Sequence, residues 1–193
     1  MFDRHRMEDA ELISRVGRGD RGAFALLYER HAKAVYNFAW MLARSVPDAE
    51  DVTQECFLAL ARKPRAFDPA RAQLRTWLLA VARNQLMQRR RRAARGALPI
   101  SLDPADLAPD PEQDLIDLEI AVERAAAVRN ALDRLPELQR EALYLFEFEG
   151  LTLAEAAAVL GIEANAVKAR LFRAREQMKR LLAPLRPVLS WKG

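Results

Sequence analysis

Cysteine and histidine are scarce in this chain of 193 residues, which holds one cysteine and two histidines. A single cysteine, Cys56, excludes an internal disulfide. His5 and His31 lie far apart in the sequence, so they form a zinc site with Cys56 only if the fold brings all three together. We therefore expect neither a structural metal nor a cofactor.

Long apolar segments are also missing. Unbroken apolar runs such as Trp77–Ala82 are far shorter than the roughly 18 residues that a membrane helix needs. The first residues, Met1–Arg6, are charged rather than apolar, unlike an export signal. We therefore expect a cytoplasmic protein with no membrane partner.

Aromatic residues make up only 7% of the chain, and β-branched residues, the other class that strands prefer, are few. Alanine, leucine, arginine and glutamate dominate instead, and all four are compatible with helices. The composition predicts an all-α protein. The length allows one domain or two small ones.

Charge is distributed unevenly along the chain. Residues 1–95 hold 19 Lys/Arg against 11 Asp/Glu, residues 96–126 hold 1 against 8, and residues 127–193 hold 11 against 8. Surplus Lys/Arg provides affinity for phosphate, although solvated helix faces also differ in charge by chance. Four prolines interrupt residues 96–117, which predicts an acidic linker between helical domains at 8–95 and 118–184.

The first domain is expected to contain four helices. Apolar residues recur at three- and four-residue steps from Glu8 to about Arg44, with glycines interrupting the pattern near residues 17–22, so two antiparallel helices are predicted. Pro47 and the acids after it open a third helix that runs to about Lys63. A fourth helix begins at about Leu74.

The third predicted helix carries an acidic face. Asp48, Asp51 and Glu55 are spaced i, i+3 and i+7, and Gln54 lies beside them. Such a face is an ordinary solvated surface, a docking surface for a basic partner, or a carboxylate cluster that binds a divalent metal for nuclease chemistry. The residue types alone leave all three open.

Basic residues follow in a loop and in the fourth helix. The proline-bounded loop 64–73 holds arginines and Phe67, whose planes suit unstacked bases. The fourth helix begins apolar and then becomes polar, with six arginines between Arg83 and Arg95. One or two arginines there would simply complement the helix dipole, but six predict a surface that lies along a phosphate backbone.

The second domain ends in a predicted helix-turn-helix. Helices are expected at residues 115–135, 137–148 and 152–160, and Gly161 then provides a left-handed cap. The final helix, from about Ala164 to Leu181, has one apolar stripe. That stripe consists of Val167, Leu171, Ala174, Met178 and Leu181.

The opposite face of this final helix presents Asn165, Ala169, Phe172, Arg173 and Glu176, flanked by Lys168, Arg170 and Arg175. A one-sided basic helix after a glycine turn is typical of a helix-turn-helix, whose second helix reads base edges in the major groove. Phe172 suits a thymine methyl, and Lys168 or Arg173 suits a guanine or a phosphate. An αα-hairpin in a plain bundle is the structural alternative.

Both halves resemble bacterial extracytoplasmic-function (ECF) sigma factors. Residues Asp48–Phe57, Leu74–Leu78 and Ala82–Asn84 are similar to region 2 of that family in order and spacing. The region 4 resemblance rests on Leu135–Ala142, Glu149–Thr152, Leu160–Ile162 and Val167–Arg175. The resemblance implies a four-helix region 2 domain and a helix-turn-helix region 4 domain.

The resemblance also implies partners and site residues. Core RNA polymerase would bind through its β′ coiled coil to Asp48, Asp51, Gln54 and Glu55, with the β flap as a second contact, and the metal interpretation falls away. The loop and the fourth helix would capture a base flipped from the minus-10 element of promoter DNA. The implied minus-10 residues are Arg65, Phe67, Arg71, Arg75, Trp77, Arg83, Asn84, Gln88, Arg89, Arg90, Arg91 and Arg92. The implied minus-35 residues are Asn165, Lys168, Ala169, Arg170, Phe172, Arg173 and Arg175.

An anti-sigma factor is a further implied partner, and the acidic linker would thread basic channels of polymerase. The sequence departs from the family at Leu74, usually Phe, at Asn165, usually Gly, and at Ala166 and Ala169, usually Thr and Ser. Two other functions stay open from residue types: a stand-alone helix-turn-helix regulator and a nuclease. A redox role for Cys56 is also open, although its apolar stripe predicts a buried thiol.

Overall fold

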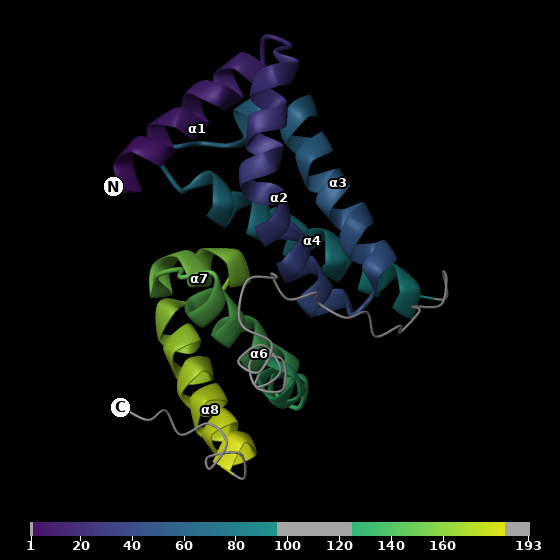
Figure 1. Ribbon diagram of the computed structural model, residues 1–193, viewed down its shortest axis with the longest axis vertical. Helices are drawn as coiled ribbons and strands as arrows, with labels where there is room; N and C mark the ends of the chain where they lie inside the picture. Colours follow the sequence, from purple (N-terminus) through teal and green to yellow (C-terminus); the bar gives the residue numbers. More distant parts are fainter. Residues whose placement is uncertain (1, 96–124, 184–193) are drawn as a thin grey trace, which may run out of the picture. The chain divides into compact units, whose positions relative to one another are not determined.

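The computed structural model describes residues 2–95 and 125–183, with side chains from Asp9 onward in the first stretch. Every regular element within these two stretches is helical (Figure 1). The predicted all-α class is therefore confirmed. The linker predicted at 96–117, and the start of the helix predicted from residue 115, lie outside the described residues.

The first two helices are α1 (Phe2–Val16) and α2 (Arg21–Ala43). The turn between them passes through Gly19, whose φ of 86° suits glycine. Asp20 then caps α2, since its Oδ1 accepts the Ala23 N–H at 3.0 Å. The break predicted near the glycines is confirmed, although α1 begins at Phe2 rather than Glu8.

A buried acid joins α1 to α2. Asp9 is 7% exposed, and Arg30 Nη1 donates to its Oδ1 at 3.0 Å. His31 Nε2 lies 2.9 Å from Asp9 Oδ2. A buried carboxylate needs such partners, so His31 belongs to this contact and is not part of a site with Cys56.

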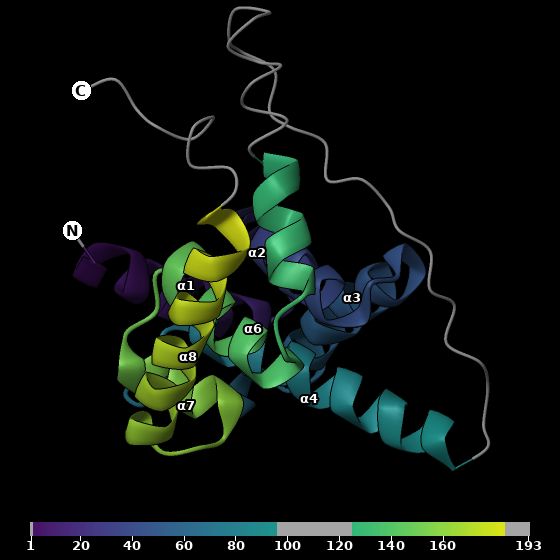
Figure 2. The same ribbon diagram turned by 90° about the horizontal axis from the view of Figure 1, so that it is seen from below.

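The helices α3 (Val46–Arg62) and α4 (Leu74–Ala94) complete the first bundle, in which α2 lies between α1 and α3 (Figure 1). Their apolar stripes meet α2 in one core, and each fully buried side chain there contributes about 1.5–3 kcal/mol. The last turns of α4 extend beyond the other three helices (Figure 2). The largest fully buried core residues are Leu27, Val35, Phe38, Leu42, Val52, Phe57, Leu60, Leu74, Leu78 and Leu79.

The second part of the chain contains a helix at residues 125–133, followed by α6 (Glu137–Leu143). The helix predicted over 137–148 is present, but its second part, Tyr144–Phe148, is a π-helical turn rather than an α-helix. In this wider turn the Glu149 N–H bonds the Tyr144 carbonyl at 3.1 Å, while Leu145 stays fully buried. A π turn often occurs at a functional position within a helix.

The final elements are α7 (Leu153–Leu160) and α8 (Ala164–Leu182). Gly161 connects them with a φ of 65°, which confirms the left-handed glycine expected there. On α8 the residues Val167, Leu171 and Ala174 are buried. Met178 and Leu181, from the same predicted stripe, are half-buried.

By its contacts the chain divides into two units, one of Met1–Ala105 with Ala154–Ile162 and the other of Asp106–Leu153 with Glu163–Gly193. The boundaries predicted at 8–95, 96–117 and 118–184 stay a prediction. Among the helices of residues 2–95 and 125–183, none is long and apolar enough to cross a membrane.

The carboxylate that caps α2 makes stability depend on pH. The Ala23 N–H, and next the Arg15 side chain, lower the pKa of Asp20 below its ordinary value of 3.8. The charged Asp20 carboxylate therefore stabilises the fold fully at pH values above 3.8, and this stabilisation is lost as the pH falls through the lowered pKa. We expect Asp20→Ala to lower the melting temperature at about pH 7 and the loss to shrink at about pH 2. Asp20→Asn is the control, because its side chain can still cap the helix but carries no charge. An equal loss of melting temperature for Asp20→Ala at both pH values would contradict this account.

The only cysteine is predicted to be chemically inert in the folded chain. Cys56 is fully buried, and burial together with the Glu55 carboxylate raises the pKa of its thiol to about 12. Because the thiolate is the reactive species, a disulfide reagent at about pH 8 should not modify Cys56 until denaturant unfolds the chain. Prompt modification of the native protein would show that the thiol is accessible and would reopen a redox role.

Candidate functional site

The acidic face of α3 lies near the start of that helix. Ser45 caps the helix by accepting the Asp48 N–H on its Oγ at 3.3 Å. The side chains of Asp48, Asp51 and Glu55 are 33%, 64% and 52% exposed. The three carboxylates therefore form a partly exposed acidic face, as the sequence predicted.

One arginine of α4 contacts all three carboxylates. Arg89 Nη1 lies 3.2 Å from Asp48 Oδ1 and 3.4 Å from Asp51 Oδ2. Its Nη2 lies 3.0 Å from Glu55 Oε1. Burial lowers the pKa of Arg89, but the Glu55 and Asp51 carboxylates outweigh it and leave the pKa above its ordinary value. Arg89 therefore faces α3, which differs from its sequence-based assignment to DNA.

The other arginines of α4 divide between two sides of the helix. Arg90 donates to the Leu42 carbonyl near the C-terminus of α2. The negative end of the helix dipole there also favours a cation. Arg83 is half-buried. The exposed residues Asn84, Gln88, Arg91 and Arg95 follow i, i+4, i+7 and i+11 spacing, with Arg92 beside them. These five form what we term the α4 stripe.

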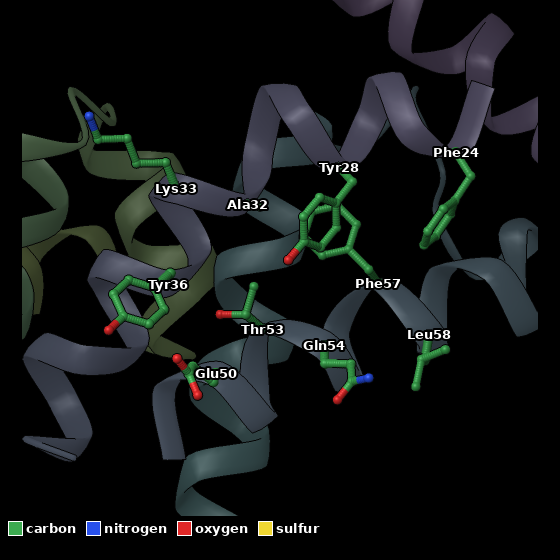
Figure 3. Close-up of a pocket in the computed structure, with 10 residues that line it drawn as sticks. All are labelled: Phe24, Tyr28, Ala32, Lys33, Tyr36, Glu50, Thr53, Gln54, Phe57 and Leu58. Carbon is green, nitrogen blue, oxygen red and sulfur yellow. The ribbon is translucent and has the colours of Figure 1, made fainter. Parts of the chain in front are cut away.

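An apolar groove adjoins the acidic face on the other side of α3. It has a volume of about 680 Å³ and lies between α2 and α3 (Figure 3). At its centre the rings of Tyr28 and Phe57 are 4.8 Å apart. Gln54 lines the groove, so it connects the groove to the acidic face. The lining residues are Phe24, Tyr28, Ala32, Lys33, Tyr36, Glu50, Thr53, Gln54, Phe57 and Leu58.

The groove was not predicted from the sequence, because Tyr28 and Tyr36 belong to the apolar periodicity from Glu8 to about Arg44, which by itself indicates only helices. Tyr28 is instead 45% exposed and Leu58 is 39% exposed. A usable signal was the hydroxyl of each tyrosine, because a buried tyrosine normally keeps its polar end near water or a partner.

The loop between α3 and α4 is more ordered than predicted. Pro64–Ala66 forms a short 3-10 helix, and Asp68 Oδ1 accepts the Ala70 N–H at 2.9 Å. Phe67 is only 6% exposed, with its ring 6.1 Å from that of Trp77 in an edge-to-face contact. The prediction that Phe67 stacks on an unpaired base is therefore not supported, because its ring faces the protein.

The remaining loop and α4 residues of the predicted minus-10 set differ in exposure. Arg65 and Arg71 are exposed, and Arg71 lies 3.6 Å from Asp68. Arg75 and Trp77 are half-buried at the start of α4. The loop thus presents two arginines around an aromatic pair that holds its shape.

The solvent face of α8 matches the sequence prediction for most residues. Asn165, Lys168, Ala169 and Arg173 are exposed, and the ring of Phe172 is 68% exposed. A single exposed apolar ring is common on protein surfaces, so the significance of Phe172 lies in its position beside Lys168 and Arg173 on this face. Arg170 is half-buried on the flank.

Arg175 makes internal contacts. Its Nη2 lies 2.7 Å from Glu147 Oε1, and its guanidinium lies 5.3 Å from the centre of the Phe146 ring. Both partners belong to the π-helical turn. Arg175 therefore connects α8 to this turn and is not simply available to DNA.

The described residues contain no group of three His, Cys, Asp or Glu side chains placed to hold a metal ion. In the acidic cluster the carboxylates converge on a guanidinium instead. This arrangement suits contact with a basic protein surface.

Two family descriptions match the sequence. "Sigma-70 region 2" matches residues 27–96, and "Sigma-70, region 4" matches residues 125–178. The first match covers α3, the loop and α4, and the second covers the helix-turn-helix.

Similar proteins match this chain along most of its length. The ECF RNA polymerase sigma factor SigM of Mycobacterium tuberculosis is 35% identical over 183 residues, which cover 94% of this chain and 88% of SigM. The RNA polymerase sigma-H factor of Pseudomonas aeruginosa is 35% identical over 188 residues, covering 92% and 95% of the two chains.

Solved structures support the same assignment. CnrH, in complex with the cytosolic domain of CnrY, is 30% identical with a TM-score of 0.65, and the match covers 92% of this chain and 98% of CnrH. The sigma factor RpoE, in complex with the anti-sigma factor NepR from Bartonella quintana, is 26% identical with a TM-score of 0.65 and coverage of 83% and 96%. This chain belongs to the ECF RNA polymerase sigma factors, the initiation subunits that direct RNA polymerase to specific promoters.

Proposed function

We propose that this sigma factor docks on core polymerase through a surface made of the acidic face of α3 and the adjoining groove. The carrying observation is that half-exposed Asp48, Asp51 and Glu55 lie on the same helix as the apolar groove, with Gln54 between them. Charges steer a basic partner, and apolar area then provides affinity. The β′ coiled coil implied by the resemblance is helical and suits a groove between two helices.

Promoter contact in the first unit is assigned to the α4 stripe with Arg65 and Arg71. All are exposed, and three of the stripe residues are arginines suited to phosphate. Arg89 and Arg90 are left out of this surface because they bond within the protein. Phe67 and Trp77 support the loop that would receive the minus-10 base.

The minus-35 element is assigned to the exposed face of α8. Lys168, Phe172 and Arg173 lie in its first half, where a recognition helix usually meets base edges. Asn165 and Ala169 continue the same face, with Arg170 and Arg175 on its flanks.

Regulation and location follow by analogy. CnrH and RpoE were solved with CnrY and with the anti-sigma factor NepR, and we infer that an anti-sigma factor controls this chain too. The β flap is assigned to the second half of the chain, and the site of action is the cytoplasm. No catalytic role is assigned. The stand-alone regulator is not favoured, because a region 2 match covers residues 27–96.

Run-off transcription with core polymerase tests the proposal. Adding the chain should start a promoter-dependent transcript. The double variant Asp51→Arg with Gln54→Ala should abolish this transcript, because it should weaken core binding about 30-fold or more, a loss of roughly 2 kcal/mol of binding free energy. Glu29→Arg, an exposed charge reversal on α2 outside the groove, is the matched control. Tight duplex binding by the free chain, with no transcript from the holoenzyme, would instead support the stand-alone regulator.

Phe172 and Lys168 should affect promoter binding in different ways. In the holoenzyme, Phe172→Ala should reduce discrimination at one minus-35 base pair by about 1–3 kcal/mol, because it removes an apolar contact to a base. Lys168→Ala should weaken all sequences alike and lower the salt dependence by about one counterion. Anisotropy titrations on single-base promoter variants measure both. Unchanged base preference in the Phe172 variant would remove that residue from the reading surface.

A further inference from the structure

The acidic docking face is already occupied by a group from the protein itself. The Arg89 guanidinium nitrogens contact one carboxylate oxygen each of Asp48, Asp51 and Glu55, at N–O distances of 3.0–3.4 Å. The side chain of Arg89 is 29% exposed, so the contact lies at the surface rather than in the core. Arg89 is therefore a cation held where a basic partner would place its own.

The fold does not depend on this contact. Packing between α3 and α4 comes from buried apolar residues such as Val52, Leu60 and Leu78, which are fully covered. The ion pairs of Arg89 are solvent-accessible, and such pairs contribute little to stability and weaken in salt. A partner with well-placed cations can therefore displace Arg89 at small cost.

We propose that Arg89 is an internal competitor for the docking face, which core polymerase displaces when it binds. This inference rests on the proposed function, since it concerns the same surface. In the free chain the face carries three carboxylates and one guanidinium, so its attraction for cations is reduced. Removing Arg89 leaves all three carboxylates to the partner.

The contact between Arg89 and the three carboxylates also affects which partners can bind this face. A partner surface with one isolated lysine gains little binding free energy on this face. Its lysine has to replace the Arg89 guanidinium, which already bonds three carboxylates at once. A partner that presents arginine, whose planar fork makes the same paired bonds, replaces the lost contacts in kind. Arg89 thus raises the specificity of the face by disfavouring weakly basic competitors.

The experiment compares Arg89→Gln with Arg21→Gln, an equal charge change at an exposed position at the start of α2, outside the groove and the α4 stripe. Labelled full-length chain is titrated with core polymerase, and association is followed by stopped flow. Arg89→Gln should bind about three- to fivefold more tightly at low salt, mainly through faster association, and the gain should fade as salt rises. Arg21→Gln should match the parent chain.

Two outcomes overturn the proposal. Weaker binding of Arg89→Gln would make Arg89 a residue that positions the carboxylates for the partner, and unchanged binding would make its ion pairs irrelevant to docking. Arg89→Lys is a second variant, which keeps the positive charge but loses the forked guanidinium. Its affinity for core polymerase should lie between those of the parent chain and Arg89→Gln. If Asp51→Arg with Gln54→Ala binds core normally, the docking surface itself is wrong, which separates that failure from failure of the Arg89 proposal.

Discussion

The rotation of each helix about its own axis is fixed by the apolar residues that α2, α3 and α4 bury together. Val52 and Leu60 on α3, and Leu78 and Leu86 on α4, point into this core. With these positions inward, Asp51 and Glu55 necessarily turn toward the edge of α3 that meets α4, where Arg89 reaches them. The core therefore decides which polar residues face one another and which face solvent.

Pairing within the protein also divides the arginines considered for DNA contact into two kinds. Arg89, Arg90 and Arg175 each bond a carboxylate or a carbonyl of the protein. Arg91, Arg92 and Arg95 are exposed on α4. The number of basic residues in a segment thus overstates the surface that faces nucleic acid, because some of these cations pair with groups of the protein itself. The proposed DNA contacts become fewer and better defined as a result.

The proposed docking surface combines two kinds of interaction on neighbouring sides of one helix. Gln54 lines the apolar groove and lies beside the carboxylates of α3. On the proposed docking model, association begins with electrostatic steering, and the exposed Tyr28 and Leu58 provide apolar contact afterwards. An anti-sigma factor that covered the groove would block both, since the two parts adjoin.

The sequence alone determined the helical segments, the left-handed Gly161, the acidic face of α3 and the exposed face of α8. These features depend on residues within a few positions of one another, through periodicity, capping and glycine conformation. The π-helical turn at Tyr144–Phe148 was not predicted, because no local pattern distinguishes it from an α-helix. Only the tertiary structure decided that Arg89 meets carboxylates 34 to 41 residues away, that Phe67 faces Trp77, and that a groove opens between α2 and α3. Those outcomes depend on how whole helices pack, and helix packing is set by the burial of the combined core rather than by any single segment.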